Sequence, residues 1–99
     1  MYGYRYAGAM LRAFRKQAKL SQKALAAKTQ VADASGVGIC ESILSQIETG
    51  KRALSWKYLS LFEAANVFSS QQLRQLRNQA IADLICRHFG DAVPPSLCE

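Results

Sequence analysis

Apolar residues recur along this chain at every third or fourth position, the spacing that lets a helix bury one face. Such stripes predict helices over residues 7–18, 40–49 and 56–65, and in the last of these Trp56, Leu59, Phe62 and Ala65 are expected to share a face. The tyrosines among residues 1–6 instead occupy alternate positions, which predicts an extended arm. The cleanest helical stripe lies in residues 71–89 and comprises Leu73, Leu76, Ala80, Ile81, Leu84 and Ile85.

Residues that begin helices complete this pattern. Ser21 is a favourable N-cap, and the strong helix formers after it predict a second helix from Gln22 onward. Ser55 precedes the fourth helix in the same way, and Ser69 or Ser70 precedes the fifth. The sequence therefore predicts an all-α fold, a compact domain of five helices.

The third predicted helix, within residues 40–52, has two chemically different faces. Its apolar positions are Ile43, Leu44 and Ile47. The opposite face carries side chains that can hydrogen-bond to a base edge or a phosphate, namely Glu41, Ser42, Ser45 and Gln46. Gly50 then supplies a left-handed stop, and the cations Lys51 and Arg52 follow. This arrangement is typical of a helix that enters a DNA groove, and equally of an amphipathic helix in any small α-domain.

The amino-acid composition says more about the kind of binding partner than about the fold. Thirteen Lys and Arg against seven Asp and Glu give the 99 residues a formal net charge of +6. This positive charge favours a polyanionic partner, with nucleic acid as the first candidate and an anionic membrane surface as the second. Alternatively, the charge only keeps the protein soluble. No run approaches the roughly 20 apolar residues that span a bilayer, so we expect no membrane segment.

The reactive side chains argue against an enzyme and a metal protein. Cys40, Cys86 and Cys98 are odd in number and irregularly spaced, which predicts a reducing, cytoplasmic setting rather than a disulfide framework. Adding His88 to the last two gives no common zinc spacing. The N-terminus lacks the pattern of a signal peptide. No nucleophile, base and acid have the spacing of a known catalytic set. We expect no catalytic residues, metal or cofactor.

Two motifs carry a resemblance to a known family. LSQKALA opens the second predicted helix, and ILSQIETGKR spans most of the third and the residues after it. Residues 10–68, which contain both, resemble the lambda-repressor/Cro type of helix-turn-helix domain, the XRE family. The resemblance implies a five-helix fold whose third helix enters the major groove of double-stranded DNA. It also implies a sequence-specific dimeric transcriptional regulator, most simply a small repressor of an inverted-repeat operator.

Carried over residue by residue, the resemblance places the DNA contacts on two helices and the loop after the second of them. Gln22 takes the position that clamps a phosphate and buttresses the base contacts. Ile43 matches a position that touches a thymine methyl group, and the cations after Gly50 match those that grip flanking phosphates. The expected DNA-binding residues are Gln22, Lys23, Glu41, Ser42, Ile43, Ser45, Gln46, Lys51 and Arg52.

The resemblance also implies a structural ion pair and has one departure. Arg15 and Glu48 match a pair that joins the first helix to the end of the third, so we do not expect them to contact DNA. Between Thr29 and Gly38, however, the chain has roughly eight residues more than the family, where the motif allows a turn of 3–4 residues. The extra residues either lengthen the second helix or form a loop.

The fifth predicted helix is the expected dimer interface. Its stripe is longer than the first four helices can cover, so part of it packs on the domain and the rest is expected to pair with a second copy. The expected interface residues are Leu76, Ala80, Ile81, Leu84 and Ile85. Alternatively, the helix only completes the core of one subunit.

We expect residues 1–99 to form a single domain, with the helix-turn-helix core in 7–68, the dimerisation helix in 69–90 and a tail in 91–99. In a chain of that length we expect no separate sensor domain. A second function stays open, an antitoxin or other protein-interaction module that binds a toxin and only secondarily DNA. The roughly ten residues after Phe89 are short for a toxin-binding tail.

Overall fold

The computed structural model describes residues 5–89, with side chains described from Tyr6 to Ile85. Within that range the chain is helical and has no strand, which confirms the predicted all-α fold of five helices. The helices are α1 (Arg5–Gln17), α2 (Gln22–Ala32), α3 (Glu41–Glu48), α4 (Trp56–Ala65) and α5 (Ser70–Phe89). The expected tail and the side chains of Cys86, His88 and Cys98 lie outside the described residues.

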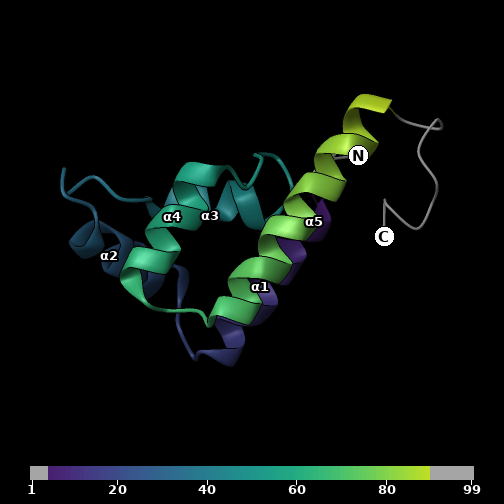
Figure 1. Ribbon diagram of the computed structural model, residues 1–99. Helices are drawn as coiled ribbons and strands as arrows, with labels where there is room; N and C mark the ends of the chain where they lie inside the picture. Colours follow the sequence, from purple (N-terminus) through teal and green to yellow (C-terminus); the bar gives the residue numbers. More distant parts are fainter. Residues whose placement is uncertain (1–4, 90–99) are drawn as a thin grey trace.

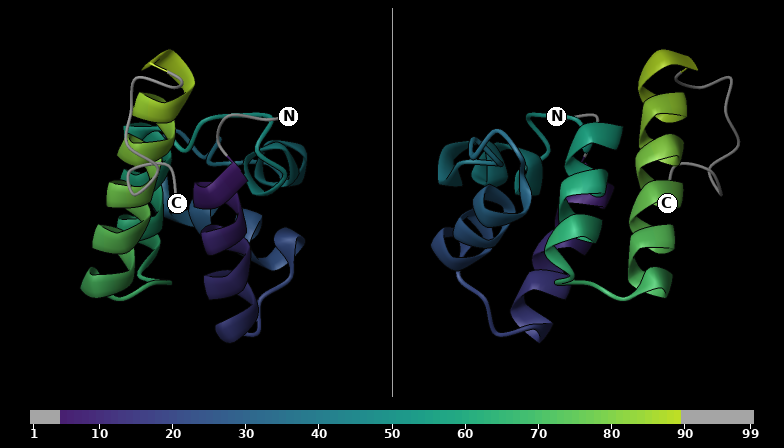
Figure 2. Two further views of the ribbon diagram at one scale, coloured as in Figure 1. Left: turned by 90° about the vertical axis from the view of Figure 1, so that its right-hand side faces the viewer. Right: turned by 60° about the vertical axis from the view of Figure 1, so that its left-hand side comes forward.

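The five helices form a closed ring of neighbours. α1 packs against α5 and α3, α2 packs against α3 and α4, and α4 packs against α5. Figure 1 shows α1 and α5 side by side at one end of the molecule and α2 at the other. The turned view in Figure 2 (left) shows α5 and α3 on opposite sides of α1.

The core lies inside this ring and receives side chains from every helix. Phe62 of α4 meets the ring of Phe68 edge-on, with centroids 5.5 Å apart. Phe14 of α1 contacts the same ring at 6.3 Å, so α1, α4 and the turn before α5 share one aromatic cluster. The largest completely buried apolar side chains are Phe62, Leu11, Leu25, Ile39, Leu44, Ile47 and Leu76.

The first turn of α1 approaches the end of α3 too closely for a side chain. A Cβ atom added to Gly8 would lie 2.1 Å from the carbonyl oxygen of Ile47. Only glycine therefore allows the two backbones to meet at this point, and the contact fixes where the C-terminal end of α3 lies.

Two of the expected serine caps use their side chains. The Ser21 hydroxyl oxygen accepts a hydrogen bond from the backbone N–H of Ala24 at 3.0 Å. Ser69 and Gln72 cap the start of α5 reciprocally, since each side chain accepts from the other residue's backbone N–H. Ser55 occupies the N-cap position of α4 without a side-chain hydrogen bond.

The structure corrects two predictions about aromatic residues. α1 begins at Arg5, so Tyr6 is helical rather than part of an extended arm. Trp56, expected to share the buried face of Leu59 and Phe62, is 62% exposed. Trp56 is the first residue of α4, and at about 100° of rotation per residue it lies about 120° around the helix from Phe62, so its side chain is off the buried face.

The extra residues between Thr29 and Gly38 both lengthen α2 and form a loop. α2 continues to Ala32, and Asp33 then organises the return of the chain. Its carboxylate accepts hydrogen bonds from the backbone N–H groups of Ser35 at 3.0 Å and Gly38 at 2.8 Å. These bonds lower the pKa of Asp33, because they favour the ionised carboxylate.

The loop closes at its base on the helix it leaves. The hydroxyl oxygen of Thr29 accepts from the backbone N–H of Ile39 at 3.0 Å, and the hydroxyl donates to the carbonyl of Ala26. Gly38 has a left-handed φ of 57°, and a Cβ atom there would lie 2.5 Å from the backbone nitrogen of Gln30. The inserted loop therefore extends away from the end of α2, and at Gly38 and Ile39 the chain is again in contact with α2 before α3 begins.

Candidate nucleic-acid interface

α3 turns its apolar residues inward and its polar residues outward. Leu44 and Ile47 are completely buried against the core, as expected of the pair that fixes this helix. Ile43 is half-buried and packs on the edge of the core, which leaves part of its side chain accessible. Among the polar residues, Glu41 and Ser42 are exposed, and Ser45 and Gln46 are half-buried.

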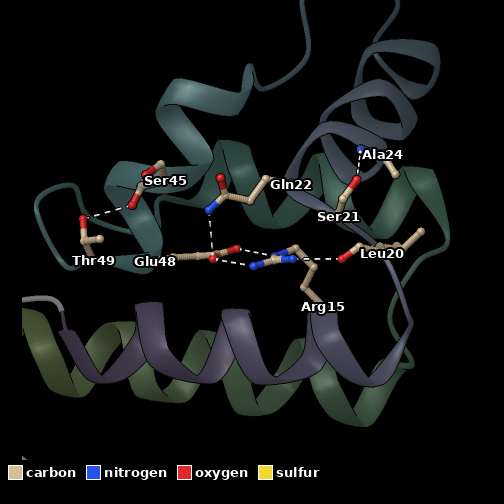
Figure 3. Close-up of polar contacts among 8 residues, drawn as sticks. All are labelled: Arg15, Leu20, Ser21, Gln22, Ala24, Ser45, Glu48 and Thr49. Atoms are coloured by element: carbon tan, nitrogen blue, oxygen red, sulfur yellow. Dashed lines mark hydrogen bonds and ion pairs between the residues drawn. The ribbon is translucent and has the colours of Figure 1, made fainter.

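A buried ion pair holds the C-terminal end of α3 (Figure 3). The Nε and Nη2 atoms of Arg15 donate to the two carboxylate oxygens of Glu48 at 2.7 and 2.9 Å. Their side chains are only 10% and 3% exposed. The hydrogen bond with Glu48 raises the pKa of Arg15, an effect that burial partly opposes. The expected ion pair is confirmed.

The same carboxylate joins a third helix to the pair. Gln22, the first residue of α2, donates from Nε2 to Oε1 of Glu48 at 3.1 Å. Arg15 also donates from Nη1 to the carbonyl of Leu20, just before α2, at 2.9 Å. Glu48 thus connects α1, α2 and α3, and this network fixes α2 and α3 relative to each other (Figure 3).

The N-terminus of α2 presents hydrogen-bond donors at this junction. Because a carboxylate only accepts hydrogen bonds, Glu48 fixes the amide orientation of Gln22 and leaves one N–H of its Nε2 to donate elsewhere. The Ser21 hydroxyl accepts from the N–H of Ala24, whereas the backbone N–H groups of Gln22 and Lys23 belong to the first turn of α2, whose donors have no acceptor within the helix. Lys23 is exposed beside them.

The residues after α3 fold back onto its last turn. Gly50 has a left-handed φ of 84°, as predicted for a helix stop. The backbone N–H groups of Lys51 and Arg52 both donate to the carbonyl of Gln46. The Arg52 Nε atom also donates to the side-chain oxygen of Gln46 at 2.9 Å, so an expected phosphate contact supports an expected base contact. Lys51 and Arg52 are both exposed.

The expected dimer residues of α5 divide between the core and the surface. Leu76 and Ala80 are buried within the single chain, so the prediction that they form a subunit interface is wrong. Ile81 and Leu84 are 46% and 39% exposed and remain available to a partner. Ile85 is half-buried.

Asp83, which the sequence analysis did not single out, lies on the inner face of α5. Its carboxylate accepts from the backbone N–H of Ala7 at 2.8 Å and from the side chain of Gln79 at 2.9 Å. It thereby satisfies a free N–H in the first turn of α1, where a negative charge is also favoured by the helix dipole. The sequence could have revealed this role, because Asp83 is an acidic residue within the apolar stripe of α5.

In the described part of the chain, no three His, Cys, Asp or Glu residues gather as metal ligands. Within the same range, no helix has the length and apolar character needed to cross a membrane. Cys40 is exposed at the N-cap of α3 and makes no capping hydrogen bond.

Comparison with protein-family models, with curated proteins and with solved structures found no match to this chain.

Proposed function

We propose that this chain is a sequence-specific regulator that binds double-stranded DNA as a helix-turn-helix protein of the lambda-repressor/Cro type. The observation that carries the proposal is the Glu48 network, which locks α3 against α1 and α2 while the polar face of α3 stays accessible. A recognition helix needs this rigidity because hydrogen bonds to base edges depend on its orientation in the major groove.

Each part of the candidate interface has a distinct task in this proposal. The donors at the start of α2, from Gln22 and Lys23, bind one phosphate, and Lys51 and Arg52 bind the backbone on the other side of α3. Ser42, Ser45 and Gln46 read base edges, with Arg52 holding the amide of Gln46 in place. A glutamine amide held in this way suits a bidentate contact to adenine.

The proposed active form is a homodimer built on the exposed side of α5. Ile81 and Leu84 supply its apolar contacts, each contributing about 1.5–3 kcal/mol when fully buried. A two-fold axis there would set the two copies of α3 about 34 Å apart, one turn of the DNA helix. The operator would then be an inverted repeat, and protein concentration would control its occupancy.

Two substitutions test the proposal through their different effects. Gln46→Ala should weaken binding to a duplex selected from a random pool by about 1–3 kcal/mol and relax the preference at one base pair. Lys51→Ala should weaken binding to selected and random duplexes alike, because phosphates are the same in both. Affinities measured by gel shift over a range of salt concentrations give both effects.

The salt dependence provides an independent check. Log affinity should fall steeply with log salt, with a slope of about −0.9 for each phosphate neutralised, and Lys51→Ala should reduce the slope by about one phosphate. A flat salt response, or no duplex retained at low salt, would refute DNA binding. If Gln46→Ala lost the same affinity on both duplexes, Gln46 would have no part in base recognition.

A further inference from the structure

Glu41 differs from the other residues of the candidate interface because it is an acid. It is the exposed first residue of α3, and the remaining expected DNA contacts are uncharged or cationic. Among the described residues, its carboxylate makes no hydrogen bond or ion pair. Leu44 and Ser45, one turn further along α3, offer no cation for a pair within the helix. The carboxylate is therefore available to a donor from outside the chain.

Support of the helix alone is a weaker explanation for this acid. A negative charge in the first turn is favoured by the helix dipole, so Glu41 stabilises α3. A serine at the preceding N-cap would give comparable support without a negative charge, yet that position holds Cys40, which makes no side-chain cap. Because DNA phosphates repel a carboxylate, an acid on this face lowers affinity for every sequence unless a base donates to it.

The hydrogen-bonding pattern of the major groove favours one base as that donor. An ionised carboxylate only accepts hydrogen bonds. Guanine presents two acceptors in the major groove, thymine presents an acceptor and a methyl group, and adenine places its N7 acceptor beside its N6 amine. Cytosine presents only its N4 amine, which is a donor. Cytosine is therefore the one base that meets a carboxylate without also presenting an acceptor of its own.

We propose that Glu41 reads a cytosine in each half-site of the operator by accepting a hydrogen bond from the N4 amine. The contact depends on the proposed function, in which α3 occupies the major groove. Glu41 also disfavours DNA that lacks this cytosine, because its charge is then repelled without compensation. Glu41 and Gln46 lie about 7.5 Å apart along α3, so at about 3.4 Å per base pair the two positions that they read lie within about three base pairs.

Selection from a random duplex pool by the wild type and by Glu41→Gln tests this assignment. The wild type should retain duplexes that share a cytosine in each half-site. Glutamine has a donor beside its acceptor, which matches the N6 and N7 atoms of adenine, so the preference at that position alone should change from cytosine to adenine. The matched control is Glu63→Gln, which removes the same charge from an exposed position of α4 and should leave every preferred base unchanged.

Gel-shift titrations of defined duplexes measure the size of the effect. The wild type should bind the selected duplex about tenfold more tightly than duplexes in which only this C·G pair is replaced, as is usual for one mismatched base pair. This comparison changes only the DNA, so it does not depend on the folding of a variant. Glu41→Gln should lose the preference for cytosine and bind random duplexes at least as tightly as the wild type, because one repulsion of the phosphates is removed.

Failure of the cytosine contact can be told apart from failure of DNA binding. A wild type that retains no shared sequence would overturn both. If the wild type and Glu41→Gln selected the same bases, only the cytosine contact would be overturned, and a loss of stability by circular dichroism would then leave Glu41 with the helix dipole alone. A change at a base pair other than C·G would also overturn it, as would a position more than three base pairs from the one relaxed by Gln46→Ala.

Discussion

Arg15→Met should destabilise the fold far more than an ordinary loss of a charged side chain. Glu48 accepts two hydrogen bonds from Arg15 and one from Gln22, and its side chain is only 3% exposed. Without Arg15, the carboxylate would stay buried with one neutral partner. Stranding a buried charge in this way costs about 3–5 kcal/mol, a large share of the roughly 5–15 kcal/mol that stabilises a typical domain.

A double-mutant cycle, in which Arg15 and Glu48 are replaced singly and together, separates the net stability that the ion pair contributes from the penalty of leaving one charge unpaired. Glu48→Met alone leaves the guanidinium of Arg15 with the carbonyl of Leu20, so it should also be strongly destabilising. The Arg15→Met/Glu48→Met variant removes both charges and should lose less stability than Arg15→Met alone. The two substitutions would then be strongly non-additive, as expected for residues in direct contact.

Urea denaturation at one protein concentration, followed by far-UV circular dichroism, measures these free energies of unfolding. Arg12→Met is the matched control, because Arg12 is exposed on the same helix and its loss should change stability by no more than about 0.5 kcal/mol. If Arg15→Met lost only about 1 kcal/mol, the pair would be behaving as a solvent-exposed salt bridge and would not hold α3 rigidly.

Three further predictions concern other parts of the fold. Asp33→Asn should be less stable than the wild type at neutral pH. The difference should vanish as pH falls through the lowered pKa of Asp33, because the carboxylate then protonates. Urea titrations at several pH values measure the difference in free energy of unfolding, and a pH-independent difference would contradict the prediction. Gly8→Ala should lower the free energy of unfolding by more than about 3 kcal/mol, because the added Cβ clashes with α3. Gly36→Ala, in open space at a φ of 77°, should lower it by only about 1 kcal/mol. Similar losses in the two variants would disprove the close approach of α1 to α3 at Gly8. Ile81→Asp/Leu84→Asp should remain helical but be monomeric by light scattering, and should bind operator DNA more weakly; a variant that is still dimeric would place the interface elsewhere.

The sequence predicted the helices well because each carries a local signal. Ser21, the Ser69–Gln72 pair and Gly50 mark boundaries through short-range hydrogen bonds or backbone conformation, which a single sequence reveals. The Arg15–Glu48 pair spans 33 positions and has no local signal. It was expected only because the order of motifs resembles a family in which such a pair occurs.

The errors arose where tertiary packing decides between equivalent positions. The stripe in α5 contains more apolar residues than one face can bury, and only the positions of α1 and α4 determine that Leu76 and Ala80 turn inward while Ile81 and Leu84 do not. Asp83 was missed because its partner is a backbone N–H of α1, 76 positions away. Trp56 precedes Leu59 and Phe62 at three-residue intervals, but each interval falls about 60° short of a full helical turn, so Trp56 lies beside the buried face and not on it.

Selection of duplexes from a random DNA pool by the purified protein, followed by sequencing, tests the central claim most directly. If α3 reads bases in the major groove of a two-fold dimer, the retained duplexes should converge on an inverted repeat whose half-sites lie about 10 base pairs apart, centre to centre. Repeating the selection with Gln46→Ala should relax one position in each half-site. Retained duplexes with no shared sequence would contradict sequence-specific recognition by this helix.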